Sequence, residues 1–461
     1  MNDEKKYDAV ILGGGLTGLT MAYYLKKAGL KIKVLEKKEY TGGVIRTITE
    51  DCFVYETGPN SGIISTIEAV ELFEDLKSIV TPEIANPDAK DRWIWKGGKW
   101  HSLPAGIIPG IKTELFTLKD KLNLLIEPLK PKGKNPEETI AELVVRRLGQ
   151  SFLDYAVDPF ISGIYAGNPY KLVTKYALPK LYNLEQNYGS FIGGAIRKKF
   201  EKQDPKLKKV SREVFSMELG LQNLVDALKY YIDDDNIETN CHDLKVELAG
   251  KPYKISYNQK GVKQELESNI VVTSMGGYSI SNIFPEIKED EISEIINLKY
   301  TKVVQAVIGY RNWTGIKLKA FGGLVPSKEK RDILGILFIS SIFKQRAPEK
   351  GALMSVFMGG ERRPDIYEMV DEDIKNIALS EVNDMLKPEN PAPDFLKIFR
   401  YEKAIPQYEE SSGMRFKQIE YLENKYQGLY LAGNIRNGIG MADRIAQAKQ
   451  LSDQIIGSHN G

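Results

Sequence analysis

The sequence predicts an α/β fold that combines a parallel unit at the N-terminus, a second mixed sheet and a helical insertion. Three observations favour this fold. A strand, a glycine-rich turn, a helix and a second strand follow one another within residues 7–36. A last buried strand and another glycine-rich turn precede a final helix near the C-terminus. Between these ends, a stretch with helical spacing is followed by several strand patterns.

Composition limits the classes of function. The 461 residues are 42% hydrophobic and 27% charged, which are ordinary values for a globular protein of two or three domains. Lys plus Arg number 64 and Asp plus Glu 62, so we expect no nucleic-acid partner. With two cysteines and three histidines, we expect no disulfide framework, metal site or histidine triad. Neither a signal peptide nor a long apolar run is visible, and we expect a cytoplasmic protein.

The N-terminal unit begins with Tyr7 to Leu12, an apolar run typical of a buried parallel strand. Leu16 to Ala28 has helical spacing, Gly29 is a plausible stop, and Lys31 to Glu36 is a second strand. These elements form a βαβ unit.

The turn of this unit is a candidate phosphate cradle. Gly13-Gly14-Gly15-Leu16-Thr17-Gly18 satisfies G-x-G-x-x-G between a strand and a helix. The glycines allow a tight turn and close approach of the backbone to a pyrophosphate, and the helix N-terminus offers free N–H groups. Glu36 follows 18 residues after Gly18, where its carboxylate can bind a ribose diol and repel a 2′-phosphate. The pattern predicts a dinucleotide site and argues against NADP.

A second glycine pair points to FAD. Gly42 and Gly43 precede Arg46, an order typical of flavoproteins of the glutathione-reductase-like class, in which the arginine can meet the pyrophosphate. Gly58-Pro59-Asn60-Ser61 forms another turn, which runs close to the flavin in that class. We therefore expect FAD as the cofactor.

Residues 91–212 are expected to be mainly helical, with helices at 136–148 and 150–158. The segment from Arg197 to Arg212 is strongly basic, which suits either a solvated helix end or a membrane-surface patch. Apolar stretches beside lysines within 106–129 leave the same alternatives open, a core-facing or a membrane-facing helix.

After a helix expected at 215–232, strand patterns return. Residues 237–248, 252–257 and 270–274 fit the cofactor-binding part of the chain. Further strands are expected in a mainly antiparallel second sheet, at 301–310, 333–341 and 352–359.

The C-terminal part repeats the signal for a flavin. A strand ends at Ala432, and Gly433 and Asn434 can approach the pyrophosphate or ribitol. Gly440 then precedes a helix that begins near Met441, whose positive end would face the N1/C2=O region of the flavin.

Together these residues resemble the oxygen-dependent protoporphyrinogen and coproporphyrinogen oxidases of the flavin amine oxidase superfamily. The discriminating stretches lie mainly in the middle of the chain: 42–47, 103–106, 159–168, 188–190, 321–326, 404–408 and 433–441. The resemblance implies a Rossmann-like FAD-binding domain formed discontinuously by residues 1–90, 211–298 and 400–461. It also implies a substrate-domain sheet at 299–399 and a helical insertion at 91–210 that touches a membrane in many relatives.

The resemblance assigns further site residues. Arg92 takes the place of an arginine that binds a substrate carboxylate, and Leu324 and Phe357 take pocket-lining positions. Tyr401 matches an aromatic position near the flavin, and Cys241 matches a position beside the adenine or is a buried structural cysteine. Two departures stand out. Gly323 replaces a common phenylalanine, so we expect a wider pocket, and residues 441–444 replace a form with smaller side chains.

The implied reaction is the stepwise oxidation of a porphyrinogen in late haem biosynthesis. A hydride passes from a methylene bridge to flavin N5, and oxygen reoxidises the flavin to give hydrogen peroxide. No acid–base residue is assigned. Protoporphyrinogen IX is preferred as the family default, and coproporphyrinogen III is the alternative. A membrane or a neighbouring pathway enzyme is a plausible source of the poorly soluble substrate.

Two other classes stay open. A flavin amine oxidase or carotenoid desaturase is one, because amine oxidases typically hold a water near N5 with a lysine and Lys302 is in the right region. The other is an FAD-binding protein without catalysis.

Overall fold

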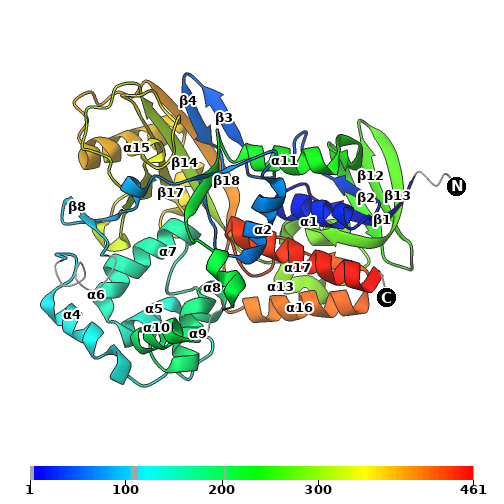
Figure 1. The fold of residues 1–461 in the computed structure, drawn as a ribbon, viewed down its shortest axis with the longest axis horizontal. Coiled ribbons are helices and arrows are strands. Elements are labelled where there is room, and N and C mark those ends of the chain that lie inside the picture. Colours follow the sequence, from blue (N-terminus) through cyan, green and yellow to red (C-terminus); the bar gives the residue numbers. More distant parts are fainter. Residues whose placement is uncertain (1–4, 105–112, 202–203, 460–461) are drawn as a thin grey trace.

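Two seven-stranded sheets and a group of helices make up the computed structural model, which describes residues 5–104, 113–201 and 204–459. The first sheet lies at the end of the molecule that carries both termini (Figure 1). The second sheet and the helices form the opposite end.

The first sheet has the order β10-β2-β1-β13-β12-β11, with β19 also beside β13. The pairs β10–β2, β2–β1, β1–β13 and β13–β19 are parallel, and β11, β12 and β13 form an antiparallel meander. Its strands are β1 (Lys6–Leu12), β2 (Ile32–Leu35), β10 (Ile237–Glu238), β11 (Cys241–Glu247), β12 (Tyr253–Gln259), β13 (Val262–Thr273) and β19 (Leu429–Leu431). The predicted α/β fold with a Rossmann-like first unit is therefore confirmed.

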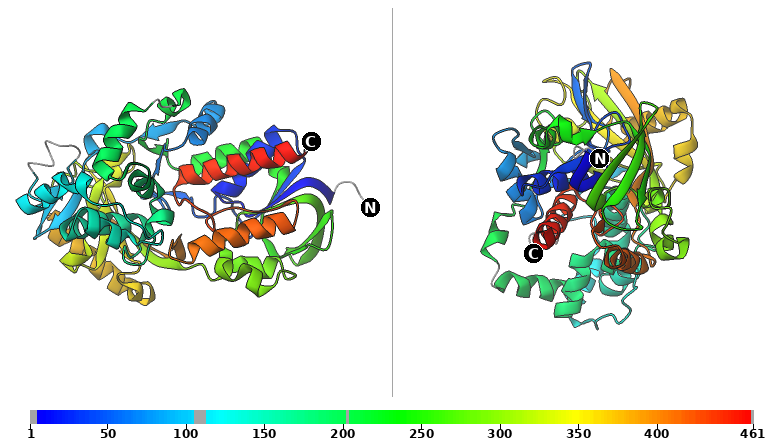
Figure 2. Two further views of the ribbon diagram at one scale, coloured as in Figure 1. Left: turned by 90° about the horizontal axis from the view of Figure 1, so that it is seen from below. Right: turned by 90° about the vertical axis from the view of Figure 1, so that its right-hand side faces the viewer.

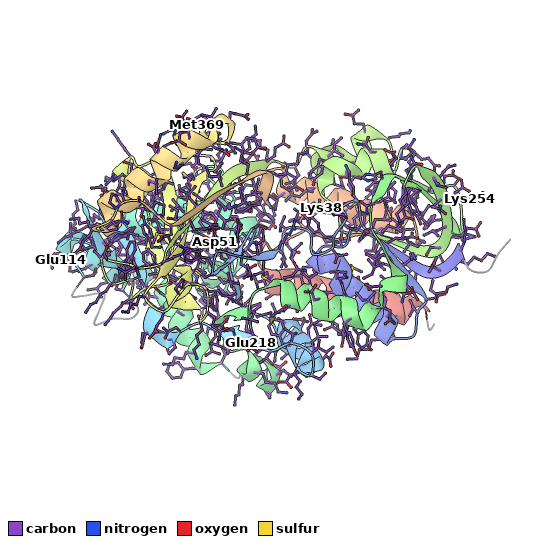
Figure 3. The ribbon with its side chains drawn as sticks, turned by 90° about the horizontal axis from the view of Figure 1, so that it is seen from above. Lys38, Asp51, Glu114, Glu218, Lys254 and Met369 are labelled. Carbon is purple, nitrogen blue, oxygen red and sulfur yellow. The ribbon has the colours of Figure 1, made fainter. Side chains whose placement is uncertain are left out.

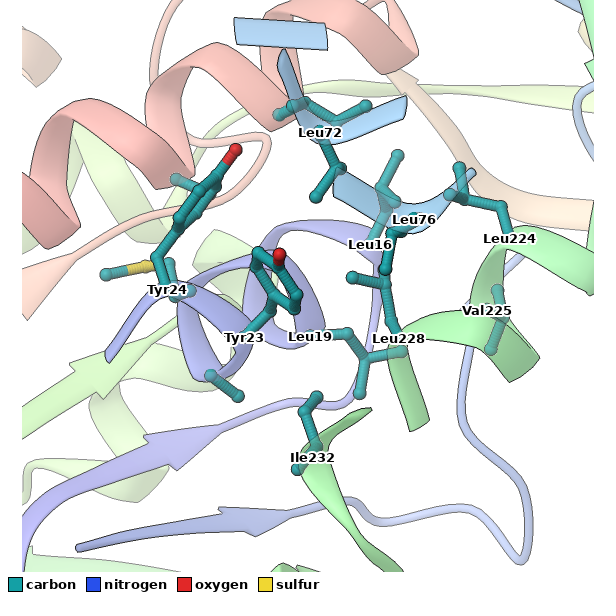
Figure 4. Packing of buried hydrophobic residues seen from close by; sticks show 14 of the residues in the cluster. Leu16, Leu19, Tyr23, Tyr24, Leu72, Leu76, Leu224, Val225, Leu228 and Ile232 are labelled. Carbon is teal, nitrogen blue, oxygen red and sulfur yellow. The ribbon is translucent and has the colours of Figure 1, made fainter. Parts of the chain in front are cut away.

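Helices cover both faces of this sheet. One face carries α1 (Leu16–Lys27), α2 (Ile67–Leu76), α11 (Gln222–Ile232) and α17 (Met441–His459). The other carries α12 (Ile280–Ile283), α13 (Glu289–Ile296) and α16 (Ser412–Lys425). Figure 2 shows α17 in red and α16 in orange on opposite sides, and Figure 4 shows how α1 packs against α2 and α11. Because both faces are covered, the central strands are apolar at successive positions instead of alternating.

The second sheet has the order β18-β14-β17-β16-β15-β7-β8, and its pairs are antiparallel except for β15–β7. Its strands are β7 (Arg92–Lys96), β8 (Lys99–Ser102), β14 (Tyr300–Tyr310), β15 (Gly322–Leu324), β16 (Ile333–Leu337), β17 (Ala352–Gly359) and β18 (Phe395–Pro406). Helix α15 (Asp371–Leu386) packs on one face. The sheet thus takes two strands from the range 91–210, expected to be helical, and β18 runs past residue 400.

Smaller strands join the two halves. They are β3 (Thr47–Glu50) and β4 (Phe53–Glu56) in a hairpin, and β5 (Gly62–Ile63), β6 (Pro82–Ile84) and β9 (Val214–Met217) in a three-stranded sheet. The helix expected at 215–232 is therefore wrong in its first part. Leu219 and Gly220 have positive φ angles, which break the helical path and delay the helix to Gln222.

The helical part contains α4 (Leu118–Leu125), α5 (Ile140–Arg147), α6 (Gln150–Phe152), a π-helical turn at Leu153–Val157, α7 (Asp158–Tyr165), α8 (Thr174–Ala177), α9 (Pro179–Tyr188) and α10 (Phe191–Phe200). Helix α5 begins later than expected because Thr139 and Glu142 form a capping box at its N-terminus. Ile94 and Leu324 of the second sheet pack against residues of this part, including Phe116 and Phe152.

The remaining short helices are α14 (Ile339–Ile342) and the 3-10 turns at Pro87–Ala89, Glu127–Leu129, Pro205–Lys209, Asp234–Asn236, Gly277–Ser279, Ser327–Glu329 and Pro364–Glu368. Parts of the two stretches considered for membrane contact, 105–112 and 202–203, lie outside the described residues. Among the described residues, no helix combines the length and apolar character needed to cross a membrane.

Candidate cofactor and substrate site

Three adjacent parallel strands, β1, β13 and β19, end side by side in the predicted cofactor region. Gly13 follows β1 with a φ of +102°, and Gly433 follows β19 with a φ of +88°. Ser274 lies between them, where its hydroxyl donates to the Gly13 carbonyl at 3.0 Å. The carboxyl edge of a parallel sheet is where ligands bind in this class of fold.

The start of α1 is open to an anion. Gly15 is its N-cap residue, no side chain caps the helix, and its first turn holds no acidic residue. The backbone N–H groups of that turn, which includes Leu16 and Thr17, therefore have no side-chain acceptor. They form the partly positive end of the helix, where an anion can bind. A Cβ on Gly18 would lie 2.0 Å from the Gly13 carbonyl oxygen, so only glycine allows this approach of helix and strand.

Glu36 lies directly against the glycine turn. It is 8% exposed, and its Oε2 accepts the Gly14 N–H at 2.7 Å, while Oε1 accepts the Lys38 N–H at 2.9 Å. Figure 3 places Lys38 near the junction of the two halves. The backbone N–H of Cys241 donates to the Glu36 carbonyl at 2.9 Å. Burial raises the pKa of the Cys241 thiol to about 12, so this group stays protonated.

The second glycine turn adjoins the first. The Gly42 N–H donates to the Gly14 carbonyl at 2.7 Å, and Gly42 and Gly43 both have positive φ angles. Arg46 is exposed, and its guanidinium lies 4.7 Å from the centre of the Tyr40 ring.

The turn at 57–61 comes next. A Cβ on Gly58 would lie 1.9 Å from the Val44 carbonyl oxygen, so the 42–46 and 57–61 turns touch. Pro59 and Ser61 are half-buried beside it. The structure thus brings together the predicted turns of the N-terminal segment.

A polar chain connects the 57–61 turn to the second sheet. Ser355 of β17 donates to the Asn60 side-chain oxygen at 3.1 Å, and Gln305 of β14 donates to Ser355 at 3.0 Å. The Tyr401 hydroxyl donates to Gln305 at 3.1 Å and contacts the Thr57 carbonyl. Burial raises the pKa of Tyr401, so its hydroxyl stays neutral.

The C-terminal turn completes the candidate cofactor site. The Asn434 side-chain oxygen accepts the Tyr300 hydroxyl at 3.1 Å. The Gly440 N–H donates to the Asp443 carboxylate at 3.1 Å, and Met441 begins α17 as a buried residue. The glycines, the uncapped helix start and the buried Glu36 fit a dinucleotide with a pyrophosphate.

The predicted substrate residues share one face of the second sheet. In the strand register Arg92 of β7 is opposite Gly322 of β15, and Leu324 follows two residues later on β15. Gly335 of β16 is opposite Leu324 on one side and opposite Phe357 of β17 on the other. Phe357 is opposite Gln305, two residues from the Val303–Tyr401 pair. Since facing residues point to the same side, Arg92, Leu324, Phe357 and Tyr401 lie on the face opposite α15.

Two glycines set the position of Leu324. A Cβ on Gly163 of α7 would lie 2.5 Å from the Leu324 side chain, and one on Gly335 would lie 3.3 Å from it. Leu324 is therefore held between α7 and β16.

The prediction that Gly323 widens the pocket is wrong. Gly323 points to the other face of the sheet, where a Cβ would lie 2.3 Å from the Trp100 ring. The indole fills the space that a larger side chain would take. The substitution changes packing under the sheet and leaves the predicted substrate face unchanged.

Sequence reasoning missed the polar chain through Gln305 and Ser355. The signal was present, because each is an isolated polar residue in an otherwise apolar strand core, and both are almost fully buried. It also missed Tyr408, Arg415 and Arg444, which lie behind the C-terminal turn. Of these, Arg444 falls in the departure at 441–444.

Comparisons with known proteins agree with this geometry. Residues 16–456 match the family described as flavin containing amine oxidoreductase. Protoporphyrinogen oxidase 2, chloroplastic/mitochondrial, of Arabidopsis thaliana is 28% identical over 97% of this chain and 93% of its own length. Coproporphyrinogen III oxidase of Bacillus subtilis is 25% identical over 97% of both chains. A solved structure from Exiguobacterium sp. 255-15, described as a candidate protoporphyrinogen oxidase, has a TM-score of 0.80 at 22% identity, covering 99% of this chain and 100% of that one.

Proposed function

Because this chain belongs to the flavin containing amine oxidoreductase family and its cofactor is FAD, we propose that it is an oxidase of protoporphyrinogen IX that uses oxygen as acceptor. The family and the relatives show an FAD-dependent oxidoreductase similar to porphyrinogen oxidases. We propose the substrate, protoporphyrinogen IX, and the electron acceptor, oxygen.

One observation favours this substrate class above the others. The face of the second sheet opposite α15 carries a cation at one end, Arg92, and the FAD-side residue Tyr401 at the other. Five strand steps of about 4.8 Å, together with a stagger of four residues at about 3.3 Å each, put them about 27 Å apart. Between them lie the half-buried apolar side chains of Leu324 and Phe357. A wide apolar ring with a peripheral carboxylate fits this order.

In the proposed reaction, bound FAD supplies the acceptor for a hydride from a methylene bridge of the macrocycle. Arg92 binds a propionate, because a guanidinium pairs bidentately with a carboxylate. Leu324 and Phe357 contact the apolar ring and hold it against the cofactor side of the sheet. Tyr401 and Gln305 keep the 57–61 turn in place through their hydrogen bonds.

The polar groups beside the proposed ring position are neutral. Asn60, Gln305 and Ser355 do not titrate, and the pKa of Tyr401 is raised by burial. These neutral side chains offer no base to the reacting bridge, so the proposed oxidation needs no protein base, and the ring loses its own N–H proton to solvent water.

The amine oxidase alternative relies on Lys302, whose amino group should then face the flavin. Its Nζ instead pairs with Glu368 at 2.6 Å and lies 4.7 Å from the centre of the Tyr367 ring. Both partners belong to the 3-10 turn at 364–368, which packs with the α15 side of the sheet. This placement favours the porphyrinogen proposal.

The experiment is a side-by-side assay of both porphyrinogens in air with purified FAD-loaded protein, following porphyrin fluorescence and hydrogen peroxide. We expect protoporphyrin IX as the main product. Porphyrin from coproporphyrinogen III alone would move the assignment to the second substrate. No porphyrin from either, together with turnover of amines or carotenes, would refute the proposal.

Arg92→Ala tests the carboxylate contact. We expect kcat/KM to fall about 10- to 100-fold, mostly through KM, since a hydrogen bond to a charged group contributes about 1.5–3 kcal/mol. Lys99→Ala on the neighbouring strand is the matched control, because Lys99 is paired in register with Lys96, four residues along β7 from Arg92 at the turn end of the hairpin, and its exposed amino group already pairs with Glu114. An unchanged KM in Arg92→Ala would remove Arg92 from the site.

We also propose a peripheral contact with an anionic membrane through α4. Leu118, Leu122 and Leu125 are 63–78% exposed along one side of this helix, and the exposed Lys119 lies next to Leu118. Flotation with anionic and with neutral vesicles tests this. Binding that prefers anionic vesicles and is lost when the three leucines become serine supports it, and no binding refutes it.

A further inference from the structure

In the turn at 433–439, between β19 and α17, most carbonyl groups accept hydrogen bonds from buried side chains. Five carbonyl oxygens in this turn accept hydrogen bonds from only three side chains. Arg444 donates to Gly433 and Asn437, Tyr408 donates to Arg436 at 2.8 Å and to Gly438 at 3.1 Å, and Arg415 donates to Ile435 at 2.9 Å. These hydrogen bonds fix the backbone conformation of the turn.

The direction of the carbonyls fixes the direction of the N–H groups. In a trans peptide the C=O and the following N–H point opposite ways. The N–H groups of Asn434, Asn437, Gly438 and Ile439 therefore point away from the three side chains. None of them donates a hydrogen bond to any atom of the described residues. Asn434, Gly438 and Ile439 are half-buried and Asn437 is exposed, so these donors can reach a ligand, and successive N–H groups of this kind form an anion-binding cradle.

The charges behind the turn have no ion-pair partner. Arg415 is fully buried and Arg444 is 8% exposed, and neither guanidinium forms an ion pair within the described part of the chain. The Nε of Arg444 and one Nη of Arg415 also lack a hydrogen-bond partner there. Burial lowers the pKa of both groups, yet a guanidinium stays protonated at neutral pH. Buried cations of this kind are costly unless an anion compensates them.

We propose that Arg444 is a positioning residue that, together with Tyr408 and Arg415, turns the N–H groups of residues 434–439 toward FAD and stabilises the reduced flavin by its charge. The flavin gains one negative charge when it takes up a hydride, so a nearby fixed cation favours that form. The inference rests on the FAD site of the proposed function and is independent of the substrate. The side chain belongs to this chain's departure from the common form at 441–444.

Two substitutions separate orientation from charge. Arg444→Met removes both, and we expect at least tenfold weaker FAD binding and a tenfold weaker preference for reduced flavin, which corresponds to a midpoint potential about 30 mV lower. Tyr408→Phe keeps the ring and removes no charge, and we expect weaker FAD binding at an unchanged potential. Lys449→Met on the same helix is the control, because it removes a charge paired with Asp453.

The measurements are titration of apo-protein with FAD and the flavin midpoint potential by dye equilibration, both without porphyrinogen. A failed substrate assignment therefore leaves this test intact. If Arg444→Met bound FAD like wild type, the role of Arg444 in orienting the N–H groups would be wrong. If it kept the wild-type midpoint potential, the role of its charge would be wrong. Should Arg444→Met not fold, Tyr408→Phe decides alone on orientation, and Arg444→Lys, expected to keep the potential, decides on charge.

Discussion

Gly18 shows how a single atom decides whether the cofactor turn can form. A Cβ at this position would lie 2.0 Å from the Gly13 backbone oxygen, and backbone cannot yield as a flexible side chain can. We expect Gly18→Ala to separate α1 from β1, lower the unfolding free energy by about 2–4 kcal/mol and abolish FAD binding. Chemical denaturation and the flavin absorbance of the purified protein measure both effects.

Gly457→Ala is the matched control for that variant. Gly457 also lies in a helix, α17, and a Cβ there meets nothing within 4 Å. Alanine should raise stability by up to about 1 kcal/mol through helix propensity and leave FAD binding unchanged. Equal behaviour of the two variants would contradict the role given to Gly18.

For single residues, the sequence predicts those features that depend on neighbours within a few positions along the chain. The glycines at 13, 42, 43 and 433 could be assigned because a tight turn needs a positive φ within a few residues. Gly323 could not, because the face that it occupies depends on pairing with β7 and β16, which are distant in sequence. Gln305 and Ser355 show the same limit, since their partners Glu56 and Asn60 lie more than 240 residues away in the sequence.

At the scale of elements, the helical part is organised around a buried ion pair. Glu127 and Arg147 are both fully buried, and Arg147 Nε donates to the Glu127 carboxylate at 2.7 Å. The same carboxylate accepts the Ser190 hydroxyl and the N–H groups of Phe191 and Ile192, so it also caps the start of α10. The loop before α5, helix α5 itself and α10 thus meet at one carboxylate.

We expect Arg147→Met to lower the unfolding free energy by about 3–5 kcal/mol, because it leaves a buried carboxylate without its counter-charge. Adding Glu127→Gln should recover part of that loss. Lys99→Met breaks the exposed pair with Glu114 and should leave the unfolding free energy nearly unchanged, because solvent screens that pair. Urea denaturation of the four proteins measures this, and a double variant no more stable than Arg147→Met would argue against the pair.

The same carboxylate predicts a pH dependence. Burial alone would raise the pKa of Glu127, but the hydrogen bonds from Phe191, Ser190, Arg147 and Ile192 outweigh it and hold the pKa below its ordinary value. Its contribution to stability is therefore present above about pH 4.3 and is lost as the pH falls through the lowered value. Denaturation at pH 3–7 should show a shallower acid loss in Glu127→Gln than in wild type.

Two helix starts were placed too early from the sequence, at α5 and at α11. Thr139 and Glu142 signal the start of α5, although the helix was expected earlier. Phe215 and Met217 are two residues apart, which is the spacing of a strand, but the apolar run continues into α11 and was included in that helix. Their strand partners, β5 and β6, come from more than 130 residues earlier. Short apolar segments cannot be assigned to helix or strand without that pairing.

For the whole molecule, the proposed cofactor site is an assembly of distant segments. Residues 13–18, 42–46, 57–61 and 433–441 meet at one sheet edge, and the polar chain through Gln305 ties them to the second sheet. Both glycine-rich ends could be read from the sequence. The contacts between the 57–61 turn and the second sheet could not be predicted, because they depend on how β14, β17 and β18 pair.

This assembly predicts what removal of FAD does. A ligand that contacts all four segments stabilises the native state by about 2.7 kcal/mol at 100 times its Kd, and it should slow hydrogen exchange in all of them together. ADP offers only the adenosine and pyrophosphate part, so it should protect residues 13–18 and leave 433–441 exchanging as in apo-protein. Hydrogen exchange followed by mass spectrometry on apo-, ADP- and FAD-loaded protein measures this. If FAD protected the N-terminal turn alone, the C-terminal turn would not belong to the cofactor site, because the unpaired N–H groups at 434–439 would have gained no partner.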